Sequence, residues 1–295
     1  MINNTNIRRI TIKSLNHLFL KVLPKNKIGD YLYALFLFFV HHKRLPKKNK
    51  FLFNDYLFMI KTSNEIFNPL RIFITDKEYL KLFISSVLGS KYNVPTLKIL
   101  KDKNEIYNYK FPKNCCIKPT HSSGQVILKK QRDEPDLGKI NSWLNINHYN
   151  TSRENNYKFL KPKIIVEPLI FNSVDVQDYK FFCFKGKVRL IQTDLDRHTN
   201  HTRKLFDVHW NDLKASMGYP YNKTKINPPT NLSKMIDIAE KISIYFNFIR
   251  VDLYSNGNQI LVGELTNCHG GACEKFFPKK SEISISKLLF AGNGF

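Results

Sequence analysis

The spacing of apolar residues changes along the chain, from a helical period near the N-terminus to short alternating runs further on. Apolar positions three and four apart predict helices at 7–23, 29–42, 75–89, 103–109, 136–148 and 232–246. Short apolar runs between turn residues predict strands at 94–100, 114–119, 125–130, 163–170, 179–184 and 187–194. This mixture is typical of an α+β fold in which helices pack against antiparallel sheets.

The strongest hairpin signal lies at 248–265. Two apolar runs flank Asn256-Gly257, a dipeptide typical of two-residue hairpin turns. One strand carries Asp252 and the other carries Glu264. Two carboxylates that meet across a hairpin repel each other unless a cation lies between them. Because Mg²⁺ binds one or two carboxylates and bridges phosphates, the pair predicts a magnesium–nucleotide site. The alternative is a solvated hairpin face with two unrelated acids.

A second stretch, at 115–128, places a lysine beside a small polar loop. An apolar strand carries Lys118, the loop contains Ser122, Ser123 and Gly124, and another apolar strand follows. Backbone N–H groups and hydroxyls in such a loop can bind phosphate oxygens, and the lysine adds a positive charge. The Walker pattern Gly-x-x-x-x-Gly-Lys-Ser/Thr is absent. An ordinary hairpin with a surface lysine explains the same residues.

The net charge points to an anionic partner. The 295 residues include 47 Lys and Arg against 24 Asp and Glu, a net charge of +23 that attracts nucleotides, nucleic acid, acidic sugars or anionic lipid. The excess is steepest in residues 1–61, which hold twelve Lys and Arg and two acids. This basic segment either lies on an anionic membrane surface or acidic polymer, or forms a helical subdomain with a solvated basic face.

The cysteine pattern and the apolar runs predict a cytoplasmic location. Five cysteines are an odd number without Cys-x-x-Cys spacing, which argues against a disulfide framework and against a zinc site. The N-terminus shows no signal-peptide pattern, and the longest apolar run, 31–40, is too short to span a bilayer. No nucleic-acid-binding module is recognisable, so specific binding to nucleic acid is not expected.

Several strings, taken in order, resemble the TupA-like ATP-grasp family of bacterial surface-polysaccharide gene clusters. The longest are Asp-Tyr-Lys-Phe-Phe-Cys-Phe, which begins at Asp178, and Asp-Arg-His-Thr-Asn-His-Thr-Arg, which ends at Arg203. Shorter matching strings stand at 76–77, 117–124, 165–167, 250–254 and 263–266. The resemblance covers roughly residues 51–278. It implies an α+β ATP-grasp fold, in which two subdomains with antiparallel sheets clamp ATP between them.

The resemblance also implies a division of the chain. A basic helical N-terminal segment at 1–73 precedes an ATP-grasp domain at 74–280. Within that domain, the small subdomain covers about 110–170 and the larger catalytic subdomain about 171–280. Residues 281–295 are interpreted as a C-terminal tail.

Each matching residue is given an expected role by the family. Contacts with ATP are implied for Lys77, Lys118, Ser122, Ser123, Gly124, Glu167, Ile170, Asp178 and Lys180. Magnesium ligands are implied at Asp252 and Glu264. Thr266 stands where many ATP-grasp enzymes have an asparagine ligand, and its hydroxyl faces the same side of the strand as Glu264. Arg250 is expected to stabilise an acyl phosphate or a tetrahedral oxyanion.

Four further residues lie near the expected site. Three of them have two possible interpretations, and a catalytic role is disfavoured for the fourth. Arg197 and Arg203 are expected to face the γ-phosphate or the substrate carboxylate, unless they form only a basic pair at a strand edge. His269 is either a base for an amine acceptor or an incidental loop residue. Cys268 is disfavoured as a nucleophile, because ATP already activates the acid and no acyl-enzyme is needed.

The activity implied by the resemblance is carboxylate–amine ligation driven by Mg-ATP through an acyl phosphate. A uronic acid or similar acidic sugar joined to an amino acid, in capsule, O-antigen or other cell-surface polysaccharide synthesis, is the expected product. The expected partners are ATP, Mg²⁺, the two substrates and, peripherally, the inner membrane face or a lipid-linked glycan. A phosphotransferase or glycosyltransferase of the same pathway and a non-catalytic polyanion-binding protein are the alternatives.

Overall fold

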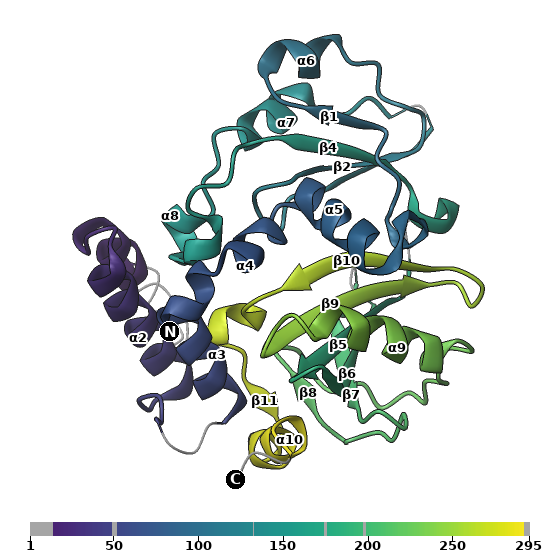
Figure 1. Ribbon diagram of the computed structural model, residues 1–295. Coiled ribbons are helices and arrows are strands. Elements are labelled where there is room, and N and C mark those ends of the chain that lie inside the picture. Colours follow the sequence, from purple (N-terminus) through teal and green to yellow (C-terminus); the bar gives the residue numbers. More distant parts are fainter. Residues whose placement is uncertain (1–13, 49–51, 132, 174–175, 197–198, 292–295) are drawn as a thin grey trace, which may run out of the picture.

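A computed structural model describes residues 14–48, 52–131, 133–173, 176–196 and 199–291, and the structural statements below concern these residues. A small antiparallel sheet lies above a larger one, and the N-terminal helices pack beside both (Figure 1). The α+β class expected from the sequence is confirmed. All five cysteines are unpaired.

The large sheet has the strand order β10-β9-β5-β6-β7, and every neighbouring pair is antiparallel. Its strands are β5 (Asp178–Phe184), β6 (Lys187–Leu195), β7 (Thr202–Phe206), β9 (Phe248–Ser255) and β10 (Ile260–Thr266). A separate two-stranded ribbon pairs β8 (Ser216–Met217) with β11 (Phe276–Phe277).

One face of the large sheet is covered by helices α9 (Leu232–Ser243) and α5 (Lys77–Leu88). The buried side chains of α9 recur three and four residues apart, as an amphipathic helix requires. Met235, Ile238 and Ile242 join Phe181 of β5 and Val251 of β9 in one buried cluster. This face is therefore an apolar core along its whole length.

The opposite face of the same sheet is divided into two halves. Alternation along β5 places Asp178, Lys180, Phe182 and Phe184 on this face. The phenylalanine half packs under α3 (Phe53–Thr62) and α10 (Ser281–Leu289). The charged half faces the small sheet instead (Figure 1). Each strand thus supplies both a packed end and a polar end.

The small sheet has the order β1-β4-β2-β3. Its strands are β1 (Lys98–Leu100), β2 (Cys115–Pro119), β3 (Ile127–Lys129) and β4 (Ile164–Pro168). Helices α6 (Lys103–Asn108) and α7 (Leu137–Trp143) bury Ile106, Ile140 and Trp143 against one of its faces. The other face carries Lys118 and Glu167 towards the large sheet.

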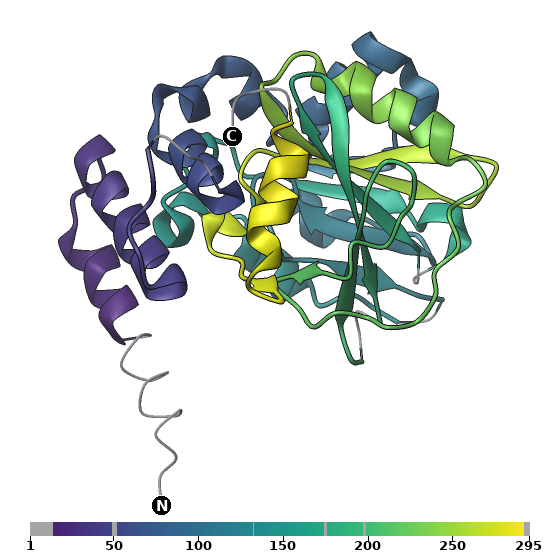
Figure 2. The same cartoon turned by 90° about the horizontal axis from the view of Figure 1, so that it is seen from below.

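The N-terminal region is a pair of helices, residues 14–22 and α2 (Lys27–His42), that projects from the body (Figure 2). Asp30 on α2 anchors it, because its carboxylate pairs with the Arg153 guanidinium at 3.0 Å and accepts a hydrogen bond from the Tyr149 hydroxyl at 2.8 Å. The remaining short helices are α4 (Pro69–Phe73), α8 (Tyr149–Ser152), η1 (Asn64–Phe67), η2 (Ser90–Tyr92), η3 (Asn155–Tyr157), η4 (Ile170–Asn172) and η5 (His269–Ala272).

Several predicted local structures differ in extent from the observed ones, and the strand predicted at 94–100 is formed only at Lys98–Leu100. The helix predicted at 136–148 ends at Trp143, and the Asn147 side chain then accepts a hydrogen bond from the Tyr149 backbone, which begins the separate turn α8. Residues 281–289, interpreted as part of a tail, form α10 and bury Ile285 and Leu289 beneath the large sheet.

The hairpin predicted at 248–265 is present, but its turn is longer than two residues. Strand β9 ends at Ser255 and β10 begins at Ile260, and these two residues pair with each other. Residues 256–259 therefore form a four-residue loop. The Asn256 side chain accepts hydrogen bonds from the backbone of Asn258 at 3.1 Å and Gln259 at 2.8 Å. This side-chain cap closes the loop in place of the tighter turn.

Candidate active site

A β-bulge brings the two predicted metal-ligand carboxylates together. The register pairs Val262 with Leu253 but Glu264 with Asp252, so one extra residue, Gly263, is inserted in β10. If the first register continued, Gly263 would stand opposite Asp252 and Glu264 would point to the other face. Gly263 suits the position because an added Cβ would lie only 2.5 Å from the Tyr254 ring.

Asp252 and Glu264 differ in their electrostatic surroundings. Burial raises the pKa of Asp252 to about 6, although Arg250 and Lys180 oppose the shift. Burial acts on Glu264 in the same direction, but Arg250, Lys77 and Lys180 outweigh it and hold the pKa of Glu264 below its usual value. The Thr266 hydroxyl donates to Glu264 at 3.3 Å, on the same side of β10 as predicted.

Arg250 is fixed by two neighbours. Its Nε and Nη2 donate to the two carboxylate oxygens of Asp252 at 2.6 and 2.7 Å. Its Nη1 donates to Nδ1 of His269, whose Nε2 in turn donates to Glu274 at 2.8 Å. Burial lowers the pKa of His269, and Arg250 and Arg203 act in the same direction. Both imidazole nitrogens are thus occupied, and His269 orients Arg250.

Seven side chains continue this chain of contacts into a closed ring. In order, they are Asp252, Arg250, His269, Glu274, Arg203, Asp194 and Lys180, which returns to Asp252. The ion pairs of the ring measure 2.6–3.7 Å. Three carboxylates and three cations balance one another. Asp178, which also pairs with Lys180, and Glu264 add two further carboxylates, so this part of the large sheet carries excess negative charge.

The small sheet contributes the opposite charge. Glu167 on β4 binds Lys81 of α5 at 2.6 Å and Lys118 of β2 at 2.7 Å, one lysine on each carboxylate oxygen. Burial raises the pKa of Glu167, but the two lysines outweigh burial and lower it. Burial lowers the pKa of Lys77, and nearby Lys118 adds to that effect. Three lysines therefore lie on this side of the gap, and two of them, Lys81 and Lys118, bind the Glu167 carboxylate.

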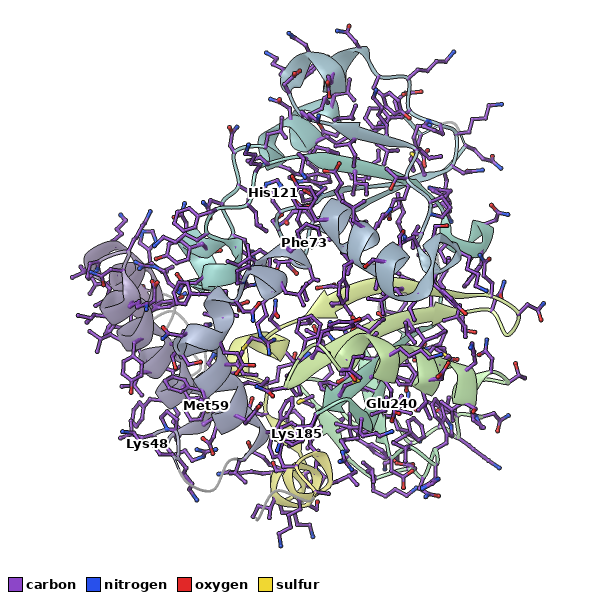
Figure 3. All side chains as sticks on the ribbon, viewed as in Figure 1. Lys48, Met59, Phe73, His121, Lys185 and Glu240 are labelled. Atoms are coloured by element: carbon purple, nitrogen blue, oxygen red, sulfur yellow. The ribbon has the colours of Figure 1, made fainter. Side chains whose placement is uncertain are left out.

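The loop after β2 is held at its base. His121, labelled in Figure 3, lies next to Trp143, with a 3.2 Å contact between its Nε2 and the Trp143 carbonyl oxygen. The Ser122 hydroxyl donates to Gln125 at 2.8 Å, and the Ser122 carbonyl oxygen accepts from Lys77 Nζ at 2.6 Å. Gly124 has a φ of +92°, a backbone conformation that favours glycine. The loop therefore begins rigidly and turns at Gly124.

Two cavities meet at Glu264. Cavity A, of about 290 Å³, lies between the sheets; its lining includes Lys77, Lys118, Glu167, Ile170, Tyr254 and Glu264. Cavity B, of about 270 Å³, has a lining that includes Ser123, Glu154, Arg250, Glu264, Thr266 and Gly271. Four of the nine residues that the sequence assigned to ATP border cavity A, namely Lys77, Lys118, Glu167 and Ile170, whereas Ser123, Arg250 and Thr266 border cavity B.

The far wall of cavity B carries another acid. Glu154 lies 3.8 Å from Lys61 Nζ, and burial raises the pKa of Glu154 while Lys61 opposes the shift. The backbone at Gly270 and Gly271 takes positive φ values of 54° and 60°, and a Cβ on Gly271 would lie 3.4 Å from both Glu154 and Lys61. Both positions favour glycine because of their backbone conformation, and a side chain on Gly270 would also meet Glu274.

The structure does not bring every predicted site residue to a cavity. Arg203 lies in the charged ring, buried against Asp194 and Glu274, and lines neither cavity. Arg197 lies outside the described residues. Asp178 and Lys180 pair with each other below the cavities. The Cys268 thiol borders cavity B, but burial raises its pKa, which disfavours a nucleophilic thiolate.

Four residues of the candidate site were given no role from the sequence. Asp194 and Glu274 complete the ring, Lys81 shares Glu167 with Lys118, and Glu154 faces cavity B. Two of them had a signal, since Lys81 follows Lys77 by one helical turn and Asp194 stands just before the family-like string that ends at Arg203. Glu154 and Glu274 come from loops whose neighbours depend on tertiary packing.

The donor set fits Mg²⁺ that is shared with phosphate. The described residues contain no cluster of three His, Cys, Asp or Glu that could hold a metal alone. Asp252 and Glu264 supply the hard oxygen ligands that Mg²⁺ prefers, in a patch with two carboxylates in excess. Both oxygens of Asp252 already accept from Arg250, which leaves Glu264, with Thr266 beside it, as the more accessible ligand.

A family model described as TupA-like ATPgrasp matches residues 59–289, which is most of the chain and confirms the resemblance seen in the sequence. Solved structures that match include an L-amino acid ligase from Bacillus licheniformis, at 12% identity and a TM-score of 0.47, covering 81% of this chain and 57% of that one. D-alanine–D-alanine ligase from Bacillus anthracis complexed with ATP matches at 15% identity and a TM-score of 0.39, covering 74% and 62%. The chain thus spans about three fifths of the length of these proteins. No curated protein matches.

Proposed function

The chain belongs to the TupA-like ATP-grasp family, and on that basis we propose that it is a carboxylate–amine ligase that uses ATP and Mg²⁺. The observation that carries the proposal is the position of Glu264, which borders both cavities and lies directly opposite Asp252. A group bound in cavity A and a group bound in cavity B would meet at this carboxylate. That is the arrangement a phosphoryl transfer between two substrates needs.

Cavity A suits ATP. Lys77 and Lys118 provide positive charge for phosphate oxygens, while Ile170 and Tyr254 provide apolar surface for a base. Lys118 is held in place by Glu167 at 2.7 Å, so its position is fixed before a ligand arrives. When bound, Mg²⁺ would neutralise charge on the phosphates, with Asp252, Glu264 and Thr266 as its protein-side ligands.

Cavity B suits the substrates to be joined. Arg250 has five N–H donors, and the contacts with Asp252 and His269 use three of them, which leaves donors for a carboxylate or an acyl phosphate. The carboxylate oxygen takes the γ-phosphoryl group, and ADP leaves. The amine nitrogen then attacks the acyl carbon, phosphate departs, and the amine loses a proton. Glu154, on the opposite wall, is placed to bind the amine as a cation before it reacts.

The substrate class follows from the charge of the protein. A net charge of +23 favours an acidic substrate, and we propose a uronic acid or similar acidic saccharide as the carboxylate and an amino acid as the amine. We propose that the reaction belongs to the synthesis of a surface polysaccharide. The +23 field and the Arg250 guanidinium in cavity B support the assignment.

The test is a substrate-dependence assay. The protein is incubated with Mg-ATP, a panel of uronic acids and polyuronates, and a panel of amino acids, and ADP and phosphate are measured. The proposal expects ADP formation that requires both an acid and an amine. It also expects hydroxylamine to replace the amine and trap the acyl phosphate as a hydroxamate.

Matched controls separate the outcomes. Glu264→Gln should abolish ADP formation, whereas substitution of an exposed lysine of the small sheet, Lys98→Ala, should leave it unchanged. Phosphoryl transfer to an acid or sugar with no amine requirement and no hydroxamate would assign a phosphotransferase instead. Turnover of a sugar nucleotide that survives Lys118→Ala would assign a glycosyltransferase.

A further inference from the structure

The N-terminal helices carry an apolar surface that the rest of the described chain leaves uncovered. Helix α2 is apolar nearly all round, and its inner side buries Tyr33 and Phe38. On the opposite side, Ile28, Leu32 and Phe39 stand four and seven residues apart and are 70%, 43% and 51% exposed. Helix α2 is apolar on two sides, and the rest of the described chain covers only one of them. The other side needs a second partner.

The preceding helix extends this surface. Leu15, Leu18 and Val22 stand three and four residues apart along residues 14–22 and are 39%, 51% and 69% exposed. The rings of Phe19 and Phe36 stack at 4.1 Å and join the two helices. Helical spacing puts Phe19 beside Leu15 and Val22, and Phe36 beside Leu32 and Phe39. We call these six exposed residues, together with the stacked rings, the apolar stripe.

Basic residues outnumber acidic ones in the segment that carries the apolar stripe. Residues 14–48 contain seven Lys and Arg and a single acid, Asp30, which is buried against Arg153. Lys43 follows Phe39 by four residues at the end of α2 and is exposed. Lys47 and Lys48 line a cavity of about 260 Å³ together with Tyr31 of α2. Lys48 stands at the outer rim of the N-terminal region in Figure 3.

The stripe does not belong to the catalytic machinery. The family match begins at residue 59, beyond both helices. The helices are nevertheless fixed to the body, because Arg153 donates to the carbonyl oxygens of Leu20 and Leu23 at 3.0 and 2.8 Å in addition to its ion pair with Asp30. The two helices that carry the stripe lie at one side of the molecule (Figure 2), so the stripe is attached to the body without a flexible connection to the site.

We propose that the apolar stripe docks on an anionic phospholipid surface. Exposed isoleucine, leucine and phenylalanine side chains would enter the boundary between headgroups and acyl chains, and the lysines around them would contact lipid phosphates. The helices would lie in the interface, since no helix in the described part of the chain is long and apolar enough to cross a bilayer. The charge around the stripe favours this partner over an apolar protein surface, because basic residues gain from an anionic bilayer.

The docking also has a geometric consequence for the site. Arg153, which binds Asp30 on the buried side of α2, directly precedes Glu154, which lines cavity B. Helix α2 therefore connects the stripe, on its outer side, with the wall of that cavity, on its inner side. This suits a substrate that is itself attached to the membrane.

The test measures co-sedimentation of the full chain with vesicles of phosphatidylcholine, with and without phosphatidylglycerol. The proposal expects binding to the anionic vesicles that weakens as salt is raised. The variant Ile28→Ser/Leu32→Ser/Phe39→Ser should bind at least about tenfold more weakly, because its apolar contacts are lost. Its thermal stability should be unchanged, since the three side chains lie outside the core.

A matched control and a charge variant complete the test. Ile244→Ser removes an isoleucine of similar exposure, 65%, at the far end of α9 and should bind vesicles like the unaltered protein. Lys43→Gln/Lys47→Gln should weaken binding to anionic vesicles and flatten its salt dependence.

Three results would overturn the proposal. The first is no binding to anionic vesicles by a chain that elutes as a monomer of 34.7 kDa. The second is equal binding by the triple serine variant. The third is a dimer that the triple variant dissociates, which would assign the stripe to a second copy of the chain. ATP turnover is measured in parallel without vesicles, so a failure of ligase activity is recognised separately.

Discussion

The two halves of one face of the large sheet have opposite properties. On β5, Phe182 follows Lys180 by two residues, and the register continues the contrast on β9, where Phe248 stands four residues before Asp252. Helices α3 and α10 close over the phenylalanine half, whereas the small sheet stands over the charged half and leaves cavities A and B. The same strands therefore stabilise the fold at one end and hold the candidate site at the other.

The largest effect is expected from the packed half. Phe248 is fully buried and contacts Phe53 and Tyr56 at ring distances of 6.0 and 6.1 Å. Phe248→Ala should lower the free energy of unfolding by about 4 kcal/mol, because a large cavity replaces the ring. Chemical denaturation measures this loss. The Kd for Mg-ATP of the folded fraction should stay within about twofold, and a large rise in that Kd would show that the halves are not separate.

A smaller loss of stability is expected where the charged ring meets the packed half. Glu274 binds Arg203 and His269, and although burial raises its pKa, His269 and Arg203 outweigh burial and lower the pKa to about 2. Glu274→Gln should cost about 2–3 kcal/mol of unfolding free energy at neutral pH.

The pH dependence of that loss has a defined sign. Because the pKa of Glu274 is depressed in the folded state, its contribution is fully present above pH about 4.5 and disappears as the pH falls towards about 2. The difference in stability between the native protein and Glu274→Gln should therefore shrink over that window. A difference that is independent of pH would contradict the ionic role of Glu274.

Substitutions on the small-sheet side should weaken the binding of Mg-ATP more than they lower the stability of the fold. Lys118→Ala should raise the Kd for Mg-ATP about tenfold to a hundredfold, measured by titration calorimetry, because a fixed cation is lost from cavity A. Lys81→Ala should have a smaller effect, since Lys81 binds Glu167 but does not line the cavity. Equal effects of the two variants would argue that both lysines act only through Glu167.

The smallest effect is expected at the bulge. Gly263→Ala places a methyl group 2.5 Å from the Tyr254 ring, which must move into cavity A. The Kd for ATP should rise about threefold to fivefold, with a loss of about 1 kcal/mol in stability. Gly138→Ala, on α7 away from the cavities, serves as the control and should change neither the Kd nor the site. An unchanged Kd in Gly263→Ala would show that the Tyr254 ring does not bound the nucleotide.

The sequence predicted which residues form the charged half better than it predicted how those residues are arranged. The hairpin, both carboxylates and Lys118 were recognisable because each lies in a local pattern of strand and turn. The bulge at Gly263 was not, since a one-residue shift of register leaves no mark in an apolar run. Without it, Glu264 would face away from Asp252.

The contacts that close the site depended on tertiary packing. Glu274 reaches Arg203 from 71 residues away, and Glu154 faces cavity B only because α2 and Arg153 hold its loop. Helix α10 was interpreted as part of a tail, and the burial of its Ile285 and Leu289 depends on contact with the large sheet. These contacts depend on which surfaces of the fold meet, and the local spacing of residues along the chain does not encode that information.

The most direct test of the account is calorimetric titration of ATP, with and without Mg²⁺, into the native protein and into Glu264→Gln. Glu264 joins the two cavities and is the more accessible of the two acidic metal ligands. We expect Mg²⁺ to strengthen ATP binding at least about tenfold in the native protein and to have no effect in Glu264→Gln, with both proteins shown to be folded at the temperature of the titration. An equal gain from Mg²⁺ in both proteins would contradict the assignment of this carboxylate to the metal.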